Sequence, residues 1–133
     1  MTWLICVVDD SDIDRYIAKR RLEKSGSVVA VIEADSGEDF LERIDQEWRK
    51  HQAADLAVLM DINMPGLSGF ETLAELKTLM DEQQPPADMK AWIYSSSSHD
   101  EDRERAAASP GVVGYITKPM DSESAEALLA ALG

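Results

Sequence analysis

The sequence predicts an α/β fold, a doubly wound (βα)5 sandwich built on a five-stranded parallel sheet. Five short apolar runs alternate along the chain with longer segments of helical spacing. The runs are almost continuously apolar, which is typical of parallel strands covered by helices on both faces. The predicted strands, in chain order, are Trp3–Asp9, Val28–Glu33, Leu56–Asp61, Ala91–Ser95 and Val112–Thr117.

The first three helices are predicted from polar residues that start a helix and from apolar residues three or four positions apart. Ser11 can cap the first helix. Asp12 and Asp14 suit its opening turn, where the helix dipole is positive. The second helix starts at Ser36, and its apolar stripe is Leu41, Ile44 and Trp48. The third starts at Ser68 or Gly69, and its stripe is Leu73, Leu76 and Met80.

The last two helices differ in the strength of their patterns. Alanines are the only apolar residues from Ser98 to Ala108, so this fourth helix is expected to be short, mobile or loosely docked. The fifth helix has the clearest stripe in the chain. It starts at Asp121 or Ser122 and continues through Ala125, Leu128, Leu129 and Leu132.

Length and composition predict one domain over residues 1–133, without an output domain after the fifth helix. The chain has 13 basic and 26 acidic residues, a net charge of −13, which disfavours nucleic-acid binding. No apolar stretch approaches the roughly 18–20 residues that span a membrane, and no signal peptide is evident. We therefore expect a cytoplasmic protein without a membrane partner. The only cysteine, Cys6, is expected to be a core residue, and partial exposure is expected for Trp3.

Four of the five predicted strands end at a polar residue. Asp9 and Asp10 end the first, Asp61 the third and Ser95 the fourth, and Lys118 follows the fifth. Ligands of open parallel sheets bind beyond the carboxyl ends of the strands. Three carboxylates at this edge would repel one another unless a divalent cation lay among them. The sequence thus predicts an Mg²⁺-type oxygen site around a potentially nucleophilic aspartate.

These residues stand in motifs that resemble the receiver domain of two-component response regulators, the CheY-like family, along essentially the whole chain. The resemblance implies the flavodoxin-like strand order 2-1-3-4-5 and, here, a stand-alone response regulator. The motifs are Asp9-Asp10, Met60-Asp61-Ile62-Asn63-Met64-Pro65-Gly66, Tyr94-Ser95-Ser96 and Gly114-Tyr115-Ile116-Thr117-Lys118-Pro119.

The resemblance implies that Asp61 accepts a phosphoryl group from a sensor histidine kinase or a histidine phosphotransfer protein. The protein would then be a regulatory domain that catalyses only its own phosphorylation and dephosphorylation. Lys118 would contact one phosphoryl oxygen, and the hydroxyl of Ser95 another. The implied ligands of Mg²⁺ or Mn²⁺ are Asp10, Asp61, the backbone carbonyl of Asn63 and, through water, Asp9.

A conformational switch is also implied by the resemblance. Ser95 would move toward the phosphoryl group and let Tyr115 turn inward, which would remodel the face formed by the fourth helix, the fifth strand and the fifth helix. A downstream protein target would bind that face. Asn63 and Ser97 would tune the lifetime of the phosphoryl group, and the bond before Pro119 is expected to be cis.

The same residues disfavour three other functions. Haloacid-dehalogenase-like phosphohydrolases also use an aspartate nucleophile, but Asp9-Asp10-Ser11-Asp12-Ile13 does not match their D-x-D-x-T/V motif. A flavodoxin-like nucleotide-binding module is disfavoured because no glycine-rich phosphate loop follows a strand. A receiver fold kept only as a scaffold is disfavoured because every charged site residue is present. The switch hydroxyl could also belong to Ser96.

Overall fold

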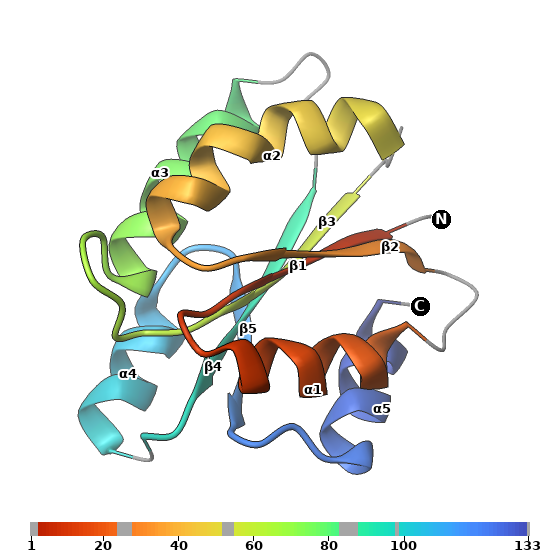
Figure 1. The fold of residues 1–133 in the computed structure, drawn as a ribbon. Coiled ribbons are helices and arrows are strands. Elements are labelled where there is room, and N and C mark those ends of the chain that lie inside the picture. The colour runs from red at the N-terminus through yellow and green to blue at the C-terminus, as the bar shows by residue number, and fades with distance from the viewer. Residues whose placement is uncertain (1–2, 24–27, 52–54, 83–87, 98, 133) are drawn as a thin grey trace.

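The computed structural model describes residues 3–23, 28–51, 55–82, 88–97 and 99–132, and these form a five-stranded sheet between two layers of helices (Figure 1). Strands and helices alternate without exception. In chain order the elements are β1 (Trp3–Val8), α1 (Asp12–Leu22), β2 (Val28–Ala34), α2 (Gly37–His51), β3 (Asp55–Met60), α3 (Gly69–Asp81), β4 (Met89–Ser95), α4 (Asp100–Ala108), β5 (Val112–Thr117) and α5 (Ser122–Ala131).

The sheet has the order β2-β1-β3-β4-β5, and every pairing in it is parallel. The predicted fold class and strand order are therefore confirmed. Helices α1 and α5 cover one face of the sheet, and α2, α3 and α4 cover the other (Figure 1). The predicted strand bounds differ from the observed ones by at most two residues. Asp9 and Asp61 lie directly after β1 and β3 rather than inside them.

Alternate residues of each central strand pack into two separate cores. On β1, Cys6 faces the α2 and α3 side, as predicted for a core cysteine, whereas Ile5 faces the α1 and α5 side. The expected partial exposure of Trp3 is wrong, because its side chain is only 1% exposed. The indole Nε1 donates a hydrogen bond to the carbonyl of Leu132 at 2.9 Å, and the Lys90 ammonium lies 5.5 Å from the ring centroid. The end of α5 therefore covers this ring.

The predicted helix starts are confirmed by hydrogen bonds that the starting side chains make. The hydroxyl of Ser11 accepts the N–H of Asp14, and the carboxylate of Asp121 accepts the N–H of Ser124. Ser68 and Glu71 form a complete capping box at α3. These caps fix where α1, α3 and α5 begin, close to the edge of the sheet at which the strands end.

Helix α4 buries fewer side chains than any other helix in the described part of the chain. It begins at Asp100, with His99 as the capping position, and the predicted start at Ser98 lies outside the described residues. Ala106 is its one buried residue. Two arginines add contacts with aromatic rings: Arg103 lies 4.5 Å from the centroid of Tyr115, and Arg105 lies 4.4 Å from that of Phe70. Such cation–π contacts at exposed sites contribute only about 0.5–1 kcal/mol each.

We expect the amide hydrogens of α4 to exchange at least about tenfold faster than those of α3 before phosphorylation. Helix α3 is the matched comparison, because it lies on the same face of the sheet and buries Leu73, Leu76 and Met80. Native-state hydrogen exchange measured by NMR at neutral pH checks this. Protection of α4 equal to that of α3 would show that the helix is not a loosely docked element.

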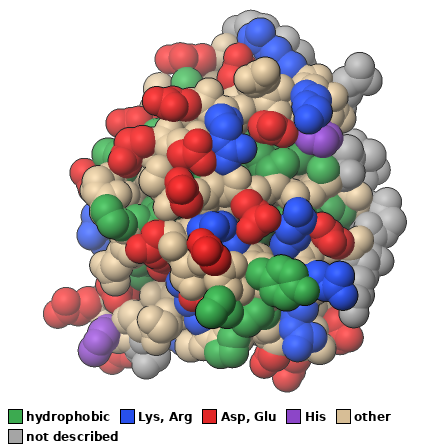
Figure 2. Space-filling view, viewed as in Figure 1, with side chains coloured by type: hydrophobic (Ala, Val, Ile, Leu, Met, Phe, Trp, Pro, Cys, Tyr) green, Lys and Arg blue, Asp and Glu red, His purple; other side chains and the backbone are tan. Residues whose placement is uncertain are grey.

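The surface is strongly acidic overall, and acidic and basic side chains are interspersed on the face shown in Figure 2. Helix faces carry most of this charge, for example through the i,i+4 pairs Asp45–Arg49 and Lys77–Asp81. Within the described part of the chain, no helix is both long and apolar enough to pass through a lipid bilayer.

Candidate functional site

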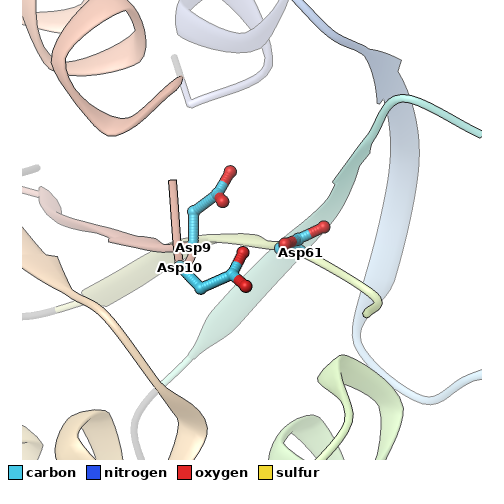
Figure 3. A group of neighbouring side chains, drawn as sticks. All are labelled: Asp9, Asp10 and Asp61. Carbon is cyan, nitrogen blue, oxygen red and sulfur yellow. The ribbon is translucent and has the colours of Figure 1, made fainter. Parts of the chain in front are cut away.

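Three aspartates meet at the carboxyl edge of the two central strands. Val8 of β1 pairs with Met60 of β3, so Asp9 and Asp61, which follow them, lie side by side. The N–H of Asp61 donates to the carbonyl of Val8 at 2.9 Å, which extends the pairing by one residue. One carboxylate oxygen from each of Asp9, Asp10 and Asp61 lies within 4.8 Å of the other two (Figure 3). The predicted acidic cluster is therefore present in the fold.

The three carboxylates differ sharply in burial. The Asp9 side chain is fully buried and Asp61 is 6% exposed, whereas Asp10 is exposed to solvent. One oxygen of Asp9, Oδ1, accepts the N–H of Ser11 at 2.9 Å. The sheet thus holds two carboxylates in place and the third is accessible. Closely spaced oxygen ligands with one side open to water are what Mg²⁺ selects in proteins.

Lys118 supplies positive charge to this acidic cluster. Its Nζ lies 2.7 Å from Oδ2 of Asp9 and 3.4 Å from Oδ1 of Asp61. Among the described residues, no donor other than this ammonium faces Oδ2 of Asp9. The backbone N–H of Lys118 donates to the carbonyl of Ser95 at 2.9 Å, and the bond to Pro119 is cis, as predicted.

The electrostatic environment acts in opposite directions on the charged forms of Asp61 and Lys118. Burial, together with the neighbouring Asp9 and Asp10, raises the pKa of Asp61 to about 7, although Lys118 opposes this effect. Burial alone would lower the pKa of Lys118. The hydrogen bond to Asp9 and the surrounding carboxylates outweigh burial, and the pKa of Lys118 is raised. A cation bound among the carboxylates would favour the ionised form of Asp61.

We expect Asp61→Asn to raise the free energy of unfolding without divalent cations, by about 2 kcal/mol at about pH 8. The folded pKa of about 7 exceeds the ordinary 3.8, so the wild-type carboxyl contributes stability below pH 3.8 and loses it as pH rises through 7. The asparagine does not titrate, so the difference should grow between about pH 4 and 7 and change little above pH 7. Urea unfolding across this range checks it. A difference in the free energy of unfolding that did not depend on pH would contradict the raised pKa of Asp61. Mg²⁺ should make this difference smaller.

The predicted switch residues meet on the loop after β4. The Ser95 side chain is 2% exposed, and its hydroxyl oxygen accepts the N–H of Ser97 at 3.0 Å. Tyr115 is half-buried, and its hydroxyl donates to the carbonyl of Ser97 at 2.7 Å. The Ser97 hydroxyl donates to Asp102 of α4 at 2.7 Å. Ser97 therefore links the loop to α4, a contact that the sequence did not predict.

The turn after Asp61 carries Asn63, the predicted carbonyl ligand, whose side chain is exposed. Gly66 in this turn has a φ of 81°, which glycine adopts without strain. Gly69 is needed for a different reason, since a Cβ there would overlap the backbone carbonyl of Asp61. Its N–H donates to the carbonyl of Ile62 at 2.9 Å. The start of α3 is thus packed directly against the backbone that carries Asp61.

Sequence reasoning missed three residues of the site. Asp14 contributes a third carboxylate to Lys118, at 3.3 Å, and the ring of Tyr94 lies 5.3 Å from the same ammonium. Arg15 donates a hydrogen bond to the backbone carbonyl of Asp9. For Asp14 and Arg15 the available signal was position: α1 begins directly after the Asp9-Asp10 pair, so its first side chains lie at the same edge of the sheet. Tyr94 directly precedes Ser95 at the end of β4.

Comparison with known proteins assigns the family. A family model described as the response regulator receiver domain matches residues 5–130. The chain belongs to this family. The receiver domain is 31% identical over 127 residues to the two-component response regulator ORR1 of Oryza sativa subsp. japonica, with 93% of this chain and 52% of the relative covered. It is 32% identical over 121 residues to the chemotaxis protein CheY of Halobacterium salinarum, with 90% and 88% covered.

The receiver domain spans about half the length of the rice regulator, so the relative's remaining segment has no counterpart in the alignment. Among solved structures, a two-component response regulator from Cytophaga hutchinsonii superimposes with a TM-score of 0.80 at 22% identity, over 98% of this chain and 96% of the other. That likeness supports the fold. The family assignment gives no support to a haloacid-dehalogenase-like phosphohydrolase.

Proposed function

We propose that this receiver domain is a Mg²⁺-dependent phosphorylation switch in which Asp61 accepts a phosphoryl group. The main support is that Asp9 and Asp61, two buried carboxylates at the edge of the sheet, share the ammonium of Lys118. A nucleophile, an acidic metal cluster and a fixed cation are the parts that phosphoryl transfer to a carboxylate requires.

The residues present fit a hard divalent cation. Asp10 and Asp61 would bind it directly, with the backbone carbonyl of Asn63 as a third ligand and Asp9 acting through water. When bound, Mg²⁺ (or Mn²⁺) would neutralise charge that develops on the phosphoryl oxygens. The two buried carboxylates of Asp9 and Asp61 support this proposal, because together they carry more negative charge than Lys118 alone can neutralise.

In the proposed transfer, a carboxylate oxygen of Asp61 attacks the phosphorus atom of a phosphohistidine. The new P–O bond forms as the P–N bond breaks, and the electron pair of that bond returns to the imidazole nitrogen. The ammonium of Lys118, 3.4 Å from Oδ1 of Asp61, is close enough to contact one phosphoryl oxygen. The Ser95 hydroxyl accepts one hydrogen bond from Ser97 and can donate its own hydrogen to another oxygen.

The proposed output begins with movement of Ser95 toward the phosphoryl group. The Ser97 segment connects Ser95 to Tyr115 and to Asp102, so this movement would reach β5 and α4 together. Between these elements is a groove of about 340 Å³, lined by Arg103, Ala106, Ala107, Val112, Val113, Gly114 and Tyr115. We propose that a downstream target binds the α4–β5–α5 face, which includes this groove. Asn63 and Ser97 would tune access of water to the phosphoryl group.

The proposed donor is a sensor histidine kinase or a histidine phosphotransfer protein, and the proposed setting is the cytoplasm, where the domain acts alone or in a phosphorelay. Family membership supports a kinase partner in general. One of the relatives is itself described as a probable histidine kinase, 29% identical over 98 residues, which match 8% of its length. That relative shows a receiver-like segment occurring within a kinase chain.

The direct test is phosphorylation by acetyl phosphate in the presence of Mg²⁺, followed by intact mass spectrometry. We expect the wild-type protein to gain one phosphoryl group, and we expect no gain when Mg²⁺ is removed by a chelator. Asp61→Asn should remain unmodified, because the nucleophilic oxygen is replaced by an amide.

A matched control is Asp55→Asn, since Asp55 is a largely buried aspartate at the opposite end of the same strand, β3. This variant should be phosphorylated like the wild type. Phosphorylation that persists in Asp61→Asn would show that another residue is the acceptor. No phosphorylation with acetyl phosphate or a phosphohistidine donor would contradict the proposed function.

A further inference from the structure

Lys118 has a carboxylate partner that lies outside the acidic metal cluster. Oδ2 of Asp14, in the first turn of α1, is 3.3 Å from its Nζ. Asp14 does not belong to the group of aspartates whose oxygens converge at the edge of the sheet. Its side chain is 25% exposed, whereas that of Lys118 is 11% exposed. The ammonium is therefore shared between the phosphorylation site and the start of α1.

Tyr94 fixes the position of this contact. It is fully buried on β4, and the centroid of its ring lies 5.3 Å from the Lys118 ammonium. Its hydroxyl donates to the backbone carbonyl of Asp14 at 3.5 Å and accepts the N–H of Met120 at 3.2 Å. One side chain thus ties together the first turn of α1 and the segment after Lys118. The ammonium is held between an aromatic ring and three carboxylates, those of Asp9, Asp14 and Asp61.

Phosphorylation changes what this ammonium must contact. If Asp61 carries a phosphoryl group, a strongly charged phosphoryl oxygen can contact the Lys118 ammonium. Asp14 then competes with that oxygen for the same ammonium. The negative charge of Asp14 also repels the incoming phosphoryl oxygens. Both effects act in the same direction, against phosphorylation. Removing the Asp14 charge leaves Asp9 and Asp61 to keep Lys118 in the site.

We infer that Asp14 is a positioning residue that restrains Lys118 in the unphosphorylated protein and slows phosphoryl transfer to Asp61. This inference rests on the proposed function and adds a regulatory element to the same site. The contact is partly exposed, so its effect is modest: a change of about two- to fivefold in the rate constant of phosphorylation. Tyr94 acts with Asp14 by holding the first turn of α1 in place.

The test compares Asp14→Asn with Asp12→Asn. Both variants remove one negative charge from the first turn of α1, but the Asp12 side chain is 91% exposed and pairs with Arg15 rather than Lys118. With acetyl phosphate and saturating Mg²⁺, we expect Asp14→Asn to be phosphorylated about two- to fivefold faster than Asp12→Asn. Asp14→Glu, which keeps the charge, should remain close to the wild type. Equal rates for the two asparagine variants, or a slower Asp14→Asn, would overturn the inference.

A second measurement does not depend on phosphorylation. The ¹⁵N resonance of the Lys118 ammonium, assigned with Lys118→Met, should shift in Asp14→Asn and exchange its protons with water faster, and it should be unchanged in Asp12→Asn. If the wild-type protein takes up no phosphoryl group, the proposed function fails, and this resonance still decides whether Asp14 holds Lys118. An unchanged resonance in Asp14→Asn would overturn the inference.

Discussion

Lys118→Met is expected to lower the free energy of unfolding by about 2–4 kcal/mol at about pH 8 without divalent cations. The Lys118 ammonium is the cation that faces Asp9, which is fully buried, and it also lies 3.4 Å from Asp61. Methionine fills similar space but leaves both carboxylates without a positively charged partner among the described residues. Removing one member of a buried pair costs more than the pair contributes, because the remaining charge stays in a poorly solvated site.

Lys77→Met is the matched control for this prediction. Lys77 lies 2.8 Å from Asp81, almost the same distance as Lys118 from Asp9, but its side chain is 43% exposed and that of Asp81 is 60% exposed. Loss of such a surface pair changes stability by less than about 1 kcal/mol. Urea unfolding measures both variants. Similar small losses for both would show that water, rather than Lys118, stabilises Asp9. Mg²⁺ should restore part of the stability of Lys118→Met only.

Gly69→Ala is expected to destabilise the protein by about 3 kcal/mol and to weaken Mg²⁺ binding at the same time. The added methyl group would overlap the backbone carbonyl of Asp61, and a backbone atom cannot move aside as the end of a side chain can. Either α3 or the turn that carries Asp61 must shift. Because Asp61 contributes one of the three clustered carboxylates, a shift of this turn changes the proposed metal site directly.

Ser68→Ala separates the two effects of Gly69→Ala. It removes the capping hydroxyl of α3, which accepts the N–H of Glu71, and should cost about 1 kcal/mol. It places no new atom near Asp61, so Mg²⁺ affinity should be retained. Thermal unfolding and Mg²⁺ titration by calorimetry measure both quantities. Unchanged Mg²⁺ affinity in Gly69→Ala would show that α3 moves and that the turn keeps its position.

Local patterns were enough to predict the order of the elements and the edge of the sheet at which the site lies. Continuous apolar runs predicted the strands, and the capping residues Ser11, Ser68 and Asp121 predicted helix starts that the structure confirms. Parallel strands bring their carboxyl ends to one edge, and the strand order that the family resemblance implied placed Asp9 beside Asp61. The roles of these residues in phosphoryl transfer remain predictions.

Contacts between side chains of distant elements could not be predicted in the same way. Asp14 and Lys118 are far apart in the chain, and their contact depends on the rotation of α1 about its axis and on the packing of Tyr94 beneath it. The sequence assigned Asp14 only a favourable place at a helix start. The burial of Trp3 is unpredictable from local sequence for a related reason, because it depends on where α5 ends.

The hydrogen bond between Trp3 and Leu132 joins the start of β1 to the end of α5, so these two segments lie on the same side of the molecule (Figure 1). That side is opposite to the strand ends that carry Asp9 and Asp61. A fluorescent reporter or an effector attached at either end would leave the approach of a phosphodonor unobstructed. It could sense phosphorylation only through changes transmitted along the body of the sheet and its helices.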